Sequence, residues 1–239
     1  MDELRIQDGV GYFADGLTII SHKNYDEYEL SSFVIPGSVQ VIDELAFCYC
    51  TALSSIVIPD SVRKIGRCAF ADCYSLSSIN MPNSVIEIEE EAFSNCYAIE
   101  KIVLPQSLTR LGFMAFYNCR GLKIIKLPNS LAIIEPGTFE GCVNLSSIVI
   151  PNSVVEIGED AFRNCTTLQT ISMGTGIKSI DTNAFSDCNA LNSIFVPKGK
   201  VESYKMILPE HYHPLIKEKL ARKKNINPSV LQLSFQDYQ

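Results

Sequence analysis

A 23-residue repeat runs through most of this chain and constrains its fold more than any other feature. The unit reads L-x-x-I-x-(I/L)-P-x-S-(V/L)-x-x-I-x-x-x-A-F-x-x-C-x-x, and residues 149–165, VIPNSVVEIGEDAFRNC, show its central part. Seven complete units occupy residues 30–190, and an eighth begins at Leu191. A unit this short cannot bury its own apolar side, whereas stacked copies share a continuous core. The repeat therefore predicts a solenoid in which each unit forms one coil.

Each unit divides into segments with recognisable local chemistry. Apolar and polar residues alternate around Ile56 and Ile58, which is typical of a half-buried strand, and Pro59 follows where that strand ends. The Asp-Ser or Asn-Ser pair after the proline favours a turn. Val62 and Ile65 predict a second short extended segment. Acidic residues then precede Ala-Phe, where they suit the start of a helical turn.

One phenylalanine and one cysteine recur in every unit at constant spacing. They are Phe47, Phe70, Phe93, Phe116, Phe139, Phe162 and Phe185, with Cys50, Cys73, Cys96, Cys119, Cys142, Cys165 and Cys188. We expect the phenylalanine to fill the interior and the cysteine to be a small buried group. Disulfide frameworks and zinc sites use clustered spacings instead. A metal or redox array of the thiols is the alternative. A four-thiolate zinc site would draw on Cys48, Cys50, Cys68 and Cys73.

The charge of the chain narrows the classes of partner. A formal net charge of -7 argues against nucleic-acid backbones and anionic membrane surfaces as main partners. No apolar run approaches the length of about 18 residues typical of a transmembrane helix, so we expect no membrane insertion. The first residues, MDELRIQDGVGYFADG, lack the basic and apolar regions of a signal peptide. We therefore expect a cytoplasmic protein if Met1 is the native start, and a secreted or cell-surface protein if a leader was removed.

The repeat pattern, with its Pro, Ala-Phe and Cys landmarks, resembles the BspA-type leucine-rich repeat over residues 30–197. The resemblance implies an α/β-type repeat solenoid that is mostly β: a right-handed arc of about eight coils with a parallel sheet on its concave face. Many proteins of this family are surface adhesins that bind host matrix proteins or other cells. Adhesion is therefore one function to weigh for this chain.

Both ends of the repeat need caps, because end coils expose core and unpaired strand edges. Residues 5–21 carry two Asp-Gly turn signals between apolar runs and predict a β-meander. We divide the chain into an N-terminal β cap at 1–29, the leucine-rich repeat solenoid at 30–197, and a helical C-terminal cap and tail at 198–239.

The C-terminal cap is expected to contain two helices. Val201, Tyr204 and Leu208 fall on one face of the first, and Pro214 suits the first position of the second. Beyond it, residues 230–235 alternate like a lone strand. That strand could pair with an edge of the repeat sheet or bind a partner strand.

No arrangement typical of an active site is visible in the sequence. His22, His211 and His213 all lie outside the repeats, and there is no G-x-S-x-G, no glycine-rich phosphate loop and no H-E-x-x-H. We predict no catalysis, no cofactor and no metal. An enzyme with an unrecognised site is the distant alternative.

Acidic residues gather along one predicted edge of the coils, relieved only by Arg67. They are Asp43, Glu44, Glu89, Glu90, Glu91, Glu135, Glu159, Asp160 and Asp181. We favour a solvated edge with favourable turn electrostatics over a docking site for a basic partner.

The outward face of the predicted sheet is the candidate binding site. Its central row is Val34, Val57, Asn80, Val103, Lys126, Val149, Ser172 and Phe195, and the flanking row adds Lys101 and Ile124 among serine and threonine. Valine and threonine also simply suit strands, which is the competing explanation. We predict a non-catalytic protein–protein interaction module that binds a protein or an extended peptide on this face. The alternative is a secreted or cell-surface adhesin with its leader removed.

Overall fold

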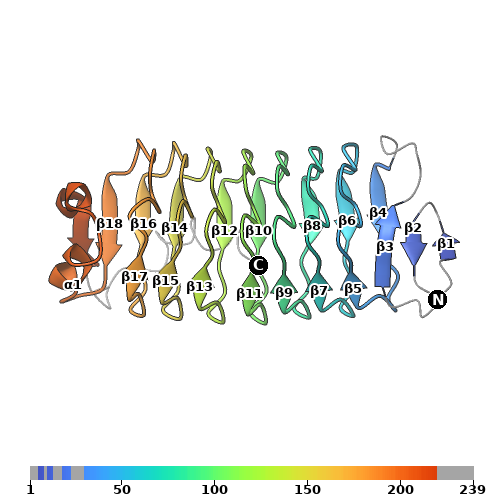
Figure 1. Cartoon of the computed structure of the whole chain (residues 1–239), viewed down its shortest axis with the longest axis horizontal. Coiled ribbons are helices and arrows are strands. Elements are labelled where there is room, and N and C mark those ends of the chain that lie inside the picture. The colour runs from blue at the N-terminus through green and yellow to red at the C-terminus, as the bar shows by residue number, and fades with distance from the viewer. Residues whose placement is uncertain (1–4, 8–9, 13–17, 23–29, 220–239) are drawn as a thin grey trace, which may run out of the picture.

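The strand predicted ahead of each proline is present in every coil. The computed structural model describes residues 5–7, 10–12, 18–22 and 30–219. We call these strands the long strands: β4 (Ser32–Val34), β6 (Ser55–Val57), β8 (Ser78–Asn80), β10 (Lys101–Val103), β12 (Ile124–Lys126), β14 (Ser147–Val149), β16 (Thr170–Ser172) and β18 (Ser193–Val196). Strands that pair are parallel and in register, so that Ile148 lies beside Ile171. Figure 1 shows the coils following one another in a row.

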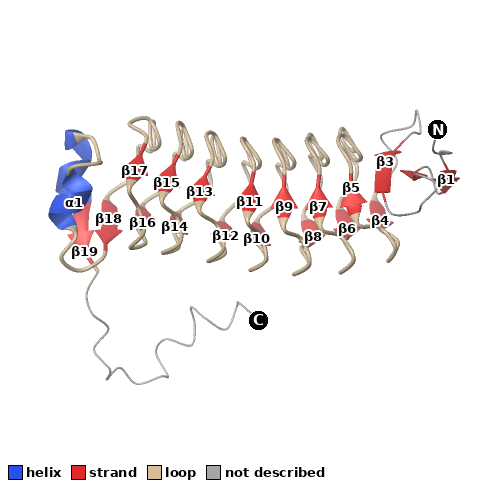
Figure 2. Ribbon diagram, turned by 60° about the horizontal axis from the view of Figure 1, so that its bottom comes forward, coloured by secondary structure: helices blue, strands red, loops and turns tan. Residues whose placement is uncertain are grey.

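The second extended segment of each unit is also confirmed. We call these the short strands: β5 (Val41–Ile42), β7 (Lys64–Ile65), β9 (Glu87–Ile88), β11 (Arg110–Leu111), β13 (Ile133–Ile134), β15 (Glu156–Ile157) and β17 (Ser179–Ile180). Their second residue faces the core, as Ile65 and Ile88 show by their complete burial. Figure 2 shows the short strands as a second line beside the long strands.

The acidic segment before Ala-Phe leads into left-handed turns and not into the helical turn that we predicted. Residues 44–49 form consecutive turns, and Leu45 and Tyr49 have φ angles of 60° and 64° in the left-handed region. Every second N–H bonds to the next coil, as the Phe47 N–H does to the Ala69 C=O over 2.7 Å, and those between them bond within the coil, as the Ala46 N–H does to the Asp43 C=O over 3.3 Å. The turns therefore add a third ladder of hydrogen bonds between coils.

The core is a stack of the repeated phenylalanine rings, as predicted. From Phe47 to Phe185, consecutive ring centroids lie 5.2–5.9 Å apart. Phe33 leans on the first ring of the stack at 5.6 Å, and Tyr212 meets the last one edge-on at 6.1 Å. Aromatic pairs of this kind contribute about 0.5–1.5 kcal/mol beyond the burial of their area.

Each repeat cysteine is buried, and from Cys73 onward the thiol donates to a carbonyl of the preceding coil. The Cys73 thiol donates to the C=O of Phe47 in the preceding coil over 3.1 Å. The same bond recurs in every following coil, ending with Cys188 and Phe162 at 3.1 Å. All nine cysteines are free thiols. The cysteine therefore satisfies a buried carbonyl as well as filling space.

The N-terminal cap is the expected β-meander. β1 (Arg5–Gln7), β2 (Val10–Tyr12) and β3 (Thr18–His22) pair antiparallel in that order, and β3 then pairs parallel with β5. The cap thus extends the sheet of short strands. The two Asp-Gly turns lie outside the described residues.

The C-terminal cap differs from the prediction after its first helix. α1 (Val201–Lys205) buries Tyr204 as expected, and the 3-10 helix η1 (Glu210–Leu215) follows. Pro214 lies inside η1, and the chain continues as strand β19 (Ile216–Glu218), which pairs parallel with β18. The open edge of β18 explains this outcome, because a strand satisfies its backbone groups and a helix would not. Residues 220–239, including the strand-like segment, lie outside the described residues.

The ladders of strands are interrupted at three places. The long strands form the sheets β4-β6-β8, β10-β12 and β14-β16-β18-β19, and the short strands form β1-β2-β3-β5-β7-β9-β11 and β13-β15-β17. The interruption between β8 and β10 affects one side of the stack only, because β9 and β11 of the same coils still pair.

Candidate functional site

The outward side chains of the long strands form one surface, which we call the strand face. We expected this face to be concave, but the row of coils curves little in Figures 1 and 2. We therefore define the face by its residues and not by its curvature. Its exposed members are Val34, Val57, Asn80, Val103, Lys126 and Val149, with Lys101 and Ile124 in the flanking row. Val34 is 69 % exposed and Val149 65 %, whereas Ile56 and Ile148 between the rows are buried. Their binding role stays a prediction.

The C-terminal end of the strand face is partly covered. Ser172 and Phe195 are only half-exposed, and Ser193 is 5 % exposed. Lys217 of β19 lies opposite Phe195 and donates from Nζ to the Ser193 hydroxyl over 2.6 Å. Sequence reasoning missed this contact because it placed a helix where β19 forms.

Two lysines carry the charge of the strand face. Lys101 and Lys126 are the charged residues in its two rows, although the chain as a whole has a net charge of -7. In the register of β10 and β12, Lys101 lies opposite Ile124 and Val103 opposite Lys126. The two ammonium groups therefore come from adjacent strands and place local positive charge on a face that is otherwise neutral.

A hollow of about 510 Å³ opens in the strand face between β8 and β10. It is lined by residues 77–81, 101–106, Asn83 and Lys126. Ile79 and Met81 are half-exposed there, whereas the equivalent Ile56 and Ile58 of the preceding coil are buried. We call this hollow the strand cleft.

The acidic edge contains more ion pairs than the sequence indicated. Arg67 pairs with Glu44 as expected. Lys64 also pairs with Glu89, at 2.7 Å, and Arg163 lies 3.4 Å from Asp160. The expectation that Arg67 alone relieves the edge is therefore wrong. Three of the nine acidic residues, Glu44, Glu89 and Asp160, thus have a charged partner within the molecule, which favours the interpretation as a solvated edge.

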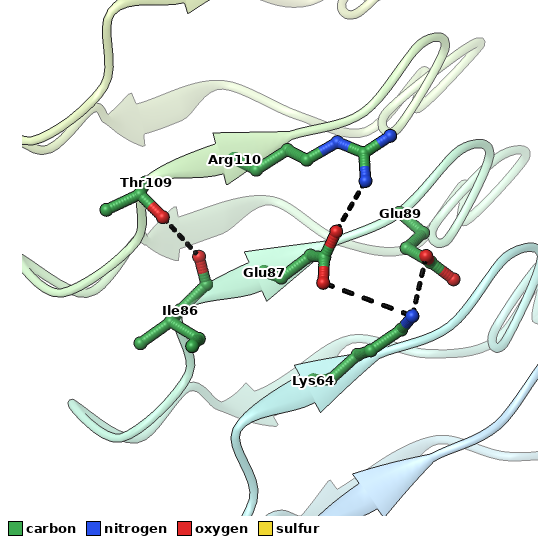
Figure 3. A network of polar contacts seen from close by, with 6 residues as sticks. All are labelled: Lys64, Ile86, Glu87, Glu89, Thr109 and Arg110. Atoms are coloured by element: carbon green, nitrogen blue, oxygen red, sulfur yellow. Dashed lines mark hydrogen bonds and ion pairs between the residues drawn. The ribbon is translucent and has the colours of Figure 1, made fainter.

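A ladder of charges crosses the neighbouring short strands (Figure 3). Glu87 of β9 accepts from Arg110 of β11 over 2.5 Å and lies 4.0 Å from Lys64 of β7. The Thr109 hydroxyl donates to the Ile86 C=O over 3.1 Å beside it. The hydrogen bond to Glu89 raises the pKa of Lys64, which keeps the ammonium charged.

The repeat thiols are buried, and the pKa values of those from Cys73 to Cys165 are raised. Burial raises the pKa of Cys119 to about 12. Burial and then the nearby Glu91 raise the pKa of Cys68 to about 11. Such thiols are protonated at neutral pH and are poor nucleophiles. Across the part of the chain that the structure describes, no group of three or more His, Cys, Asp or Glu could hold a metal ion, so the four-thiolate zinc interpretation has no support.

A row of aromatic side chains on another corner of the coils was missed by sequence reasoning. Tyr74 and Tyr97 are exposed and stack at 5.0 Å, and the Arg120 guanidinium lies 5.4 Å from the centroid of the Tyr97 ring. The repeat could have predicted this row, because each of the three residues directly follows a repeat cysteine and so occupies the same position in its coil.

An amide ladder beneath this row fixes its backbone. Asn95 donates from Nδ2 to Asp72 over 2.8 Å, and Asn118 donates in the same way to Asn95 over 2.7 Å. Arg120 donates from Nε to the Asn118 side-chain oxygen over 2.9 Å. Asp72, Asn95 and Asn118 all have left-handed φ angles, a conformation that Asn and Asp tolerate better than most residues.

His211 and His213 both make contacts through their rings. The His211 ring lies 3.9 Å from the Tyr212 ring, and His213 Nε2 lies 3.1 Å from the Leu208 C=O. Both belong to the C-terminal cap, far along the row from the centre of the strand face. Within the described ranges, no helix is both long and apolar enough to cross a membrane.

Comparison with known proteins gives a family match and several structural matches. The BspA type leucine rich repeat region matches in six copies, over residues 18–142 and 86–206. A search of curated proteins finds no match. The fold is similar to that of a leucine-rich repeat protein from Bacteroides ovatus, with 25 % identity over 90 % of this chain and 67 % of that chain and a TM-score of 0.56.

Two further solved structures share this architecture. A leucine-rich repeat protein from T. pallidum is 26 % identical, with a TM-score of 0.54 over 93 % of this chain and 97 % of that chain. The pneumococcal vaccine antigen PcpA gives a TM-score of 0.58 over 92 % of this chain and 48 % of that chain. Its identity of 19 % shows a common fold alone.

Proposed function

Because the chain belongs to the BspA type leucine-rich repeat family, we propose that it is a non-catalytic module that binds a partner protein on the strand face. Leucine-rich repeat proteins are typically non-enzymatic, and solenoids of this kind present extended surfaces to protein partners. Of the surfaces described above, the strand face has the features that best suit a protein partner.

The observation that carries the proposal is the exposed apolar row of the strand face. Val34, Val57, Val103 and Val149 are all exposed, and Ile124 is exposed beside them. A row of exposed apolar groups, here interrupted by Asn80 and Lys126, counts for more than scattered apolar residues. With serine and threonine beside it, such a surface loses little on desolvation and offers hydroxyls for hydrogen bonds, which suits a protein partner.

Three double variants, each on a different surface, test the location. Val103→Glu with Val149→Glu should leave folding intact, because both side chains point away from the core, and should weaken partner binding by about 2 kcal/mol or more. Glu90→Lys with Glu159→Lys on the acidic edge should mainly change the association rate and its salt dependence. Tyr74→Ala with Tyr97→Ala tests the aromatic row. Partners would be captured from the native cell by wild type, identified by mass spectrometry, and titrated against all three variants.

The outcome discriminates between the surfaces. If the valine variant binds as tightly as wild type while the edge or tyrosine variant loses the partner, the strand face is not the binding site. The adhesin alternative differs in the nature of the partner, a matrix or cell-surface protein. The same variants titrated against purified matrix proteins would test it.

A further inference from the structure

The strand cleft is a place where one sheet could accept an additional strand. In four coils the residue before the proline position donates its N–H to the next coil, as Ile35 does to the Val57 C=O over 3.0 Å and Met173 to the Phe195 C=O over 2.8 Å. Among the described residues, the corresponding bonds from Ile58, Met81 and Leu127 are not formed, and at Met81 this coincides with the interruption between β8 and β10, which belong to different sheets. Asn80 stands here where neighbouring coils carry valine, and asparagine is depleted in strands.

The cleft has a closed back, because the same two coils remain joined elsewhere. β9 pairs with β11, and the Phe93 N–H donates to the Ala115 C=O over 2.9 Å. The coils therefore open only at the strand face. An occupant of the cleft would be supported by these ladders and would not need to separate the stack.

Each wall of the cleft presents a strand edge. β8 uses one edge to pair with β6, where the Ser78 N–H donates to the Ser54 C=O over 3.1 Å. Since successive backbone groups of a strand point to opposite neighbours, the N–H and C=O of Ile79 point toward the cleft. The same alternation turns the N–H and C=O of Val103 toward it, because β10 pairs with β12 on its other side. Unpaired strand edges are templates for the addition of an extended peptide.

The charge of the cleft indicates the chemistry of its occupant. Lys101 and Lys126 both line it, and they are the charged residues in the two rows of the strand face. Half-exposed Ile79 and Met81 and exposed Val103 supply apolar contacts on the same walls. An extended segment that alternates apolar and acidic side chains complements both features.

We propose that the strand cleft between β8 and β10 binds an extended, acidic segment of a partner protein as an added β-strand. The proposal rests on the proposed function and specifies the kind of segment that the strand face recognises. Backbone pairing supplies the contact with β8 and β10, and the two lysines select for carboxylates.

A labelled probe peptide tests the proposal on the full chain. The probe alternates valine and threonine and carries two glutamates, and its matched control carries two lysines instead. We expect the acidic probe to shift the backbone amide resonances of Ile79, Met81 and Val103, and the lysine probe to leave them unchanged. N-methylation of alternate amides of the acidic probe should abolish the shifts, because it removes the donors of a strand.

Charge-swap variants supply the second arm. Lys101→Glu with Lys126→Glu should weaken the acidic probe about tenfold or more in fluorescence anisotropy and should strengthen the lysine probe. Lys178→Glu with Lys200→Glu, which makes the same change of charge away from the strand face, should leave both affinities within about twofold, the effect of surface charge alone. Equal binding of the N-methylated and unmodified probes would overturn the proposal. An equal loss of affinity for the acidic probe in the two double variants would also overturn it.

Other occupants give distinct results. A variant ending at residue 219 that shows altered Ile79 and Val103 resonances without any peptide would assign the cleft to this chain's own residues 220–239 and refute the partner segment. Dimers seen by analytical ultracentrifugation and abolished by Lys101→Glu with Lys126→Glu would assign it to a second copy. If the acidic probe fails while Val103→Glu with Val149→Glu still loses the captured partner, the cleft proposal falls and the proposed function stands.

Discussion

At the scale of single residues, position in the repeat decides what a side chain does. Phe116 is fully buried, with its ring centroid 5.3 Å from that of Phe93 and 5.9 Å from that of Phe139. Phe113, three residues earlier, is 38 % exposed. The two phenylalanines share a coil and a chemistry, but only Phe116 belongs to the ring stack.

Truncating these two residues should therefore have very different effects on stability. Phe116→Ala should lower the free energy of unfolding by about 3–5 kcal/mol, because it leaves a cavity in a core that two neighbouring coils share. Phe113→Ala is the matched control and should change it by about 0.5 kcal/mol or less. Urea denaturation followed by circular dichroism measures both. Equal losses would show that the ring stack is not the stabilising interior.

At the scale of elements, four of the seven short strands, β7, β9, β11 and β15, combine a buried apolar residue with a charged one. In β9, Ile88 is fully buried, and Glu87 joins the charge ladder between Lys64 and Arg110. All three charged side chains reach solvent, since Arg110 keeps 61 %, Lys64 37 % and Glu87 26 % of the side-chain surface accessible. Solvent and salt screen such pairs, so the apolar residue should contribute more to stability than the ladder.

Substitutions at the two adjacent positions of β9 test this comparison. Glu87→Gln should cost less than about 1 kcal/mol, and the loss should shrink further in high salt. Ile88→Ala should cost about 2–5 kcal/mol at any salt concentration, because it removes buried apolar volume. Thermal unfolding at low and high ionic strength gives both values. A large loss for Glu87→Gln that is insensitive to salt would contradict this ranking.

At the scale of the whole molecule, stability depends on contacts between neighbouring coils and on the closure of both ends. The β-meander continues the short-strand sheet at one end, and β19 covers the edge of β18 at the other. Tyr212 places its ring edge-on against the last phenylalanine of the stack. Without these contacts the final coil would expose a strand edge and an aromatic ring to water.

Removal of the C-terminal cap should therefore destabilise the chain and promote self-association. A variant ending at residue 197 loses α1, η1 and β19, and we expect a lower thermal midpoint and dimers in analytical ultracentrifugation, because the β18 edge is left open. A matched variant ending at residue 219 keeps all three elements. If the two variants have the same midpoint and are both monomeric, the cap does not close the sheet.

The sequence by itself determined the features that repeat. A constant period of 23 residues places each Phe and Cys at one position of the coil, and alternation around Ile56 and Ile58 places the valines of the strand face outside. These inferences hold because, in a stack of similar coils, each residue lies beside the equivalent residue of the next coil. The left-handed turns could also have been predicted from the sequence. Asp72, Asn95 and Asn118 each precede a repeat cysteine, and Asp and Asn tolerate left-handed φ angles.

Only the tertiary structure decided the features that depend on the pairing of particular coils. The left-handed turns form in place of a helical turn because every second N–H group bonds to the next coil. The pattern within one unit does not show these partners. β19 forms a strand because β18 presents an open edge, although Pro214 favoured a helix start. The strand cleft arises because two coils separate at β8 and β10 while their other ladders hold. Local sequence specifies the path of each coil, and the hydrogen bonds between coils decide where the stack opens and how it ends.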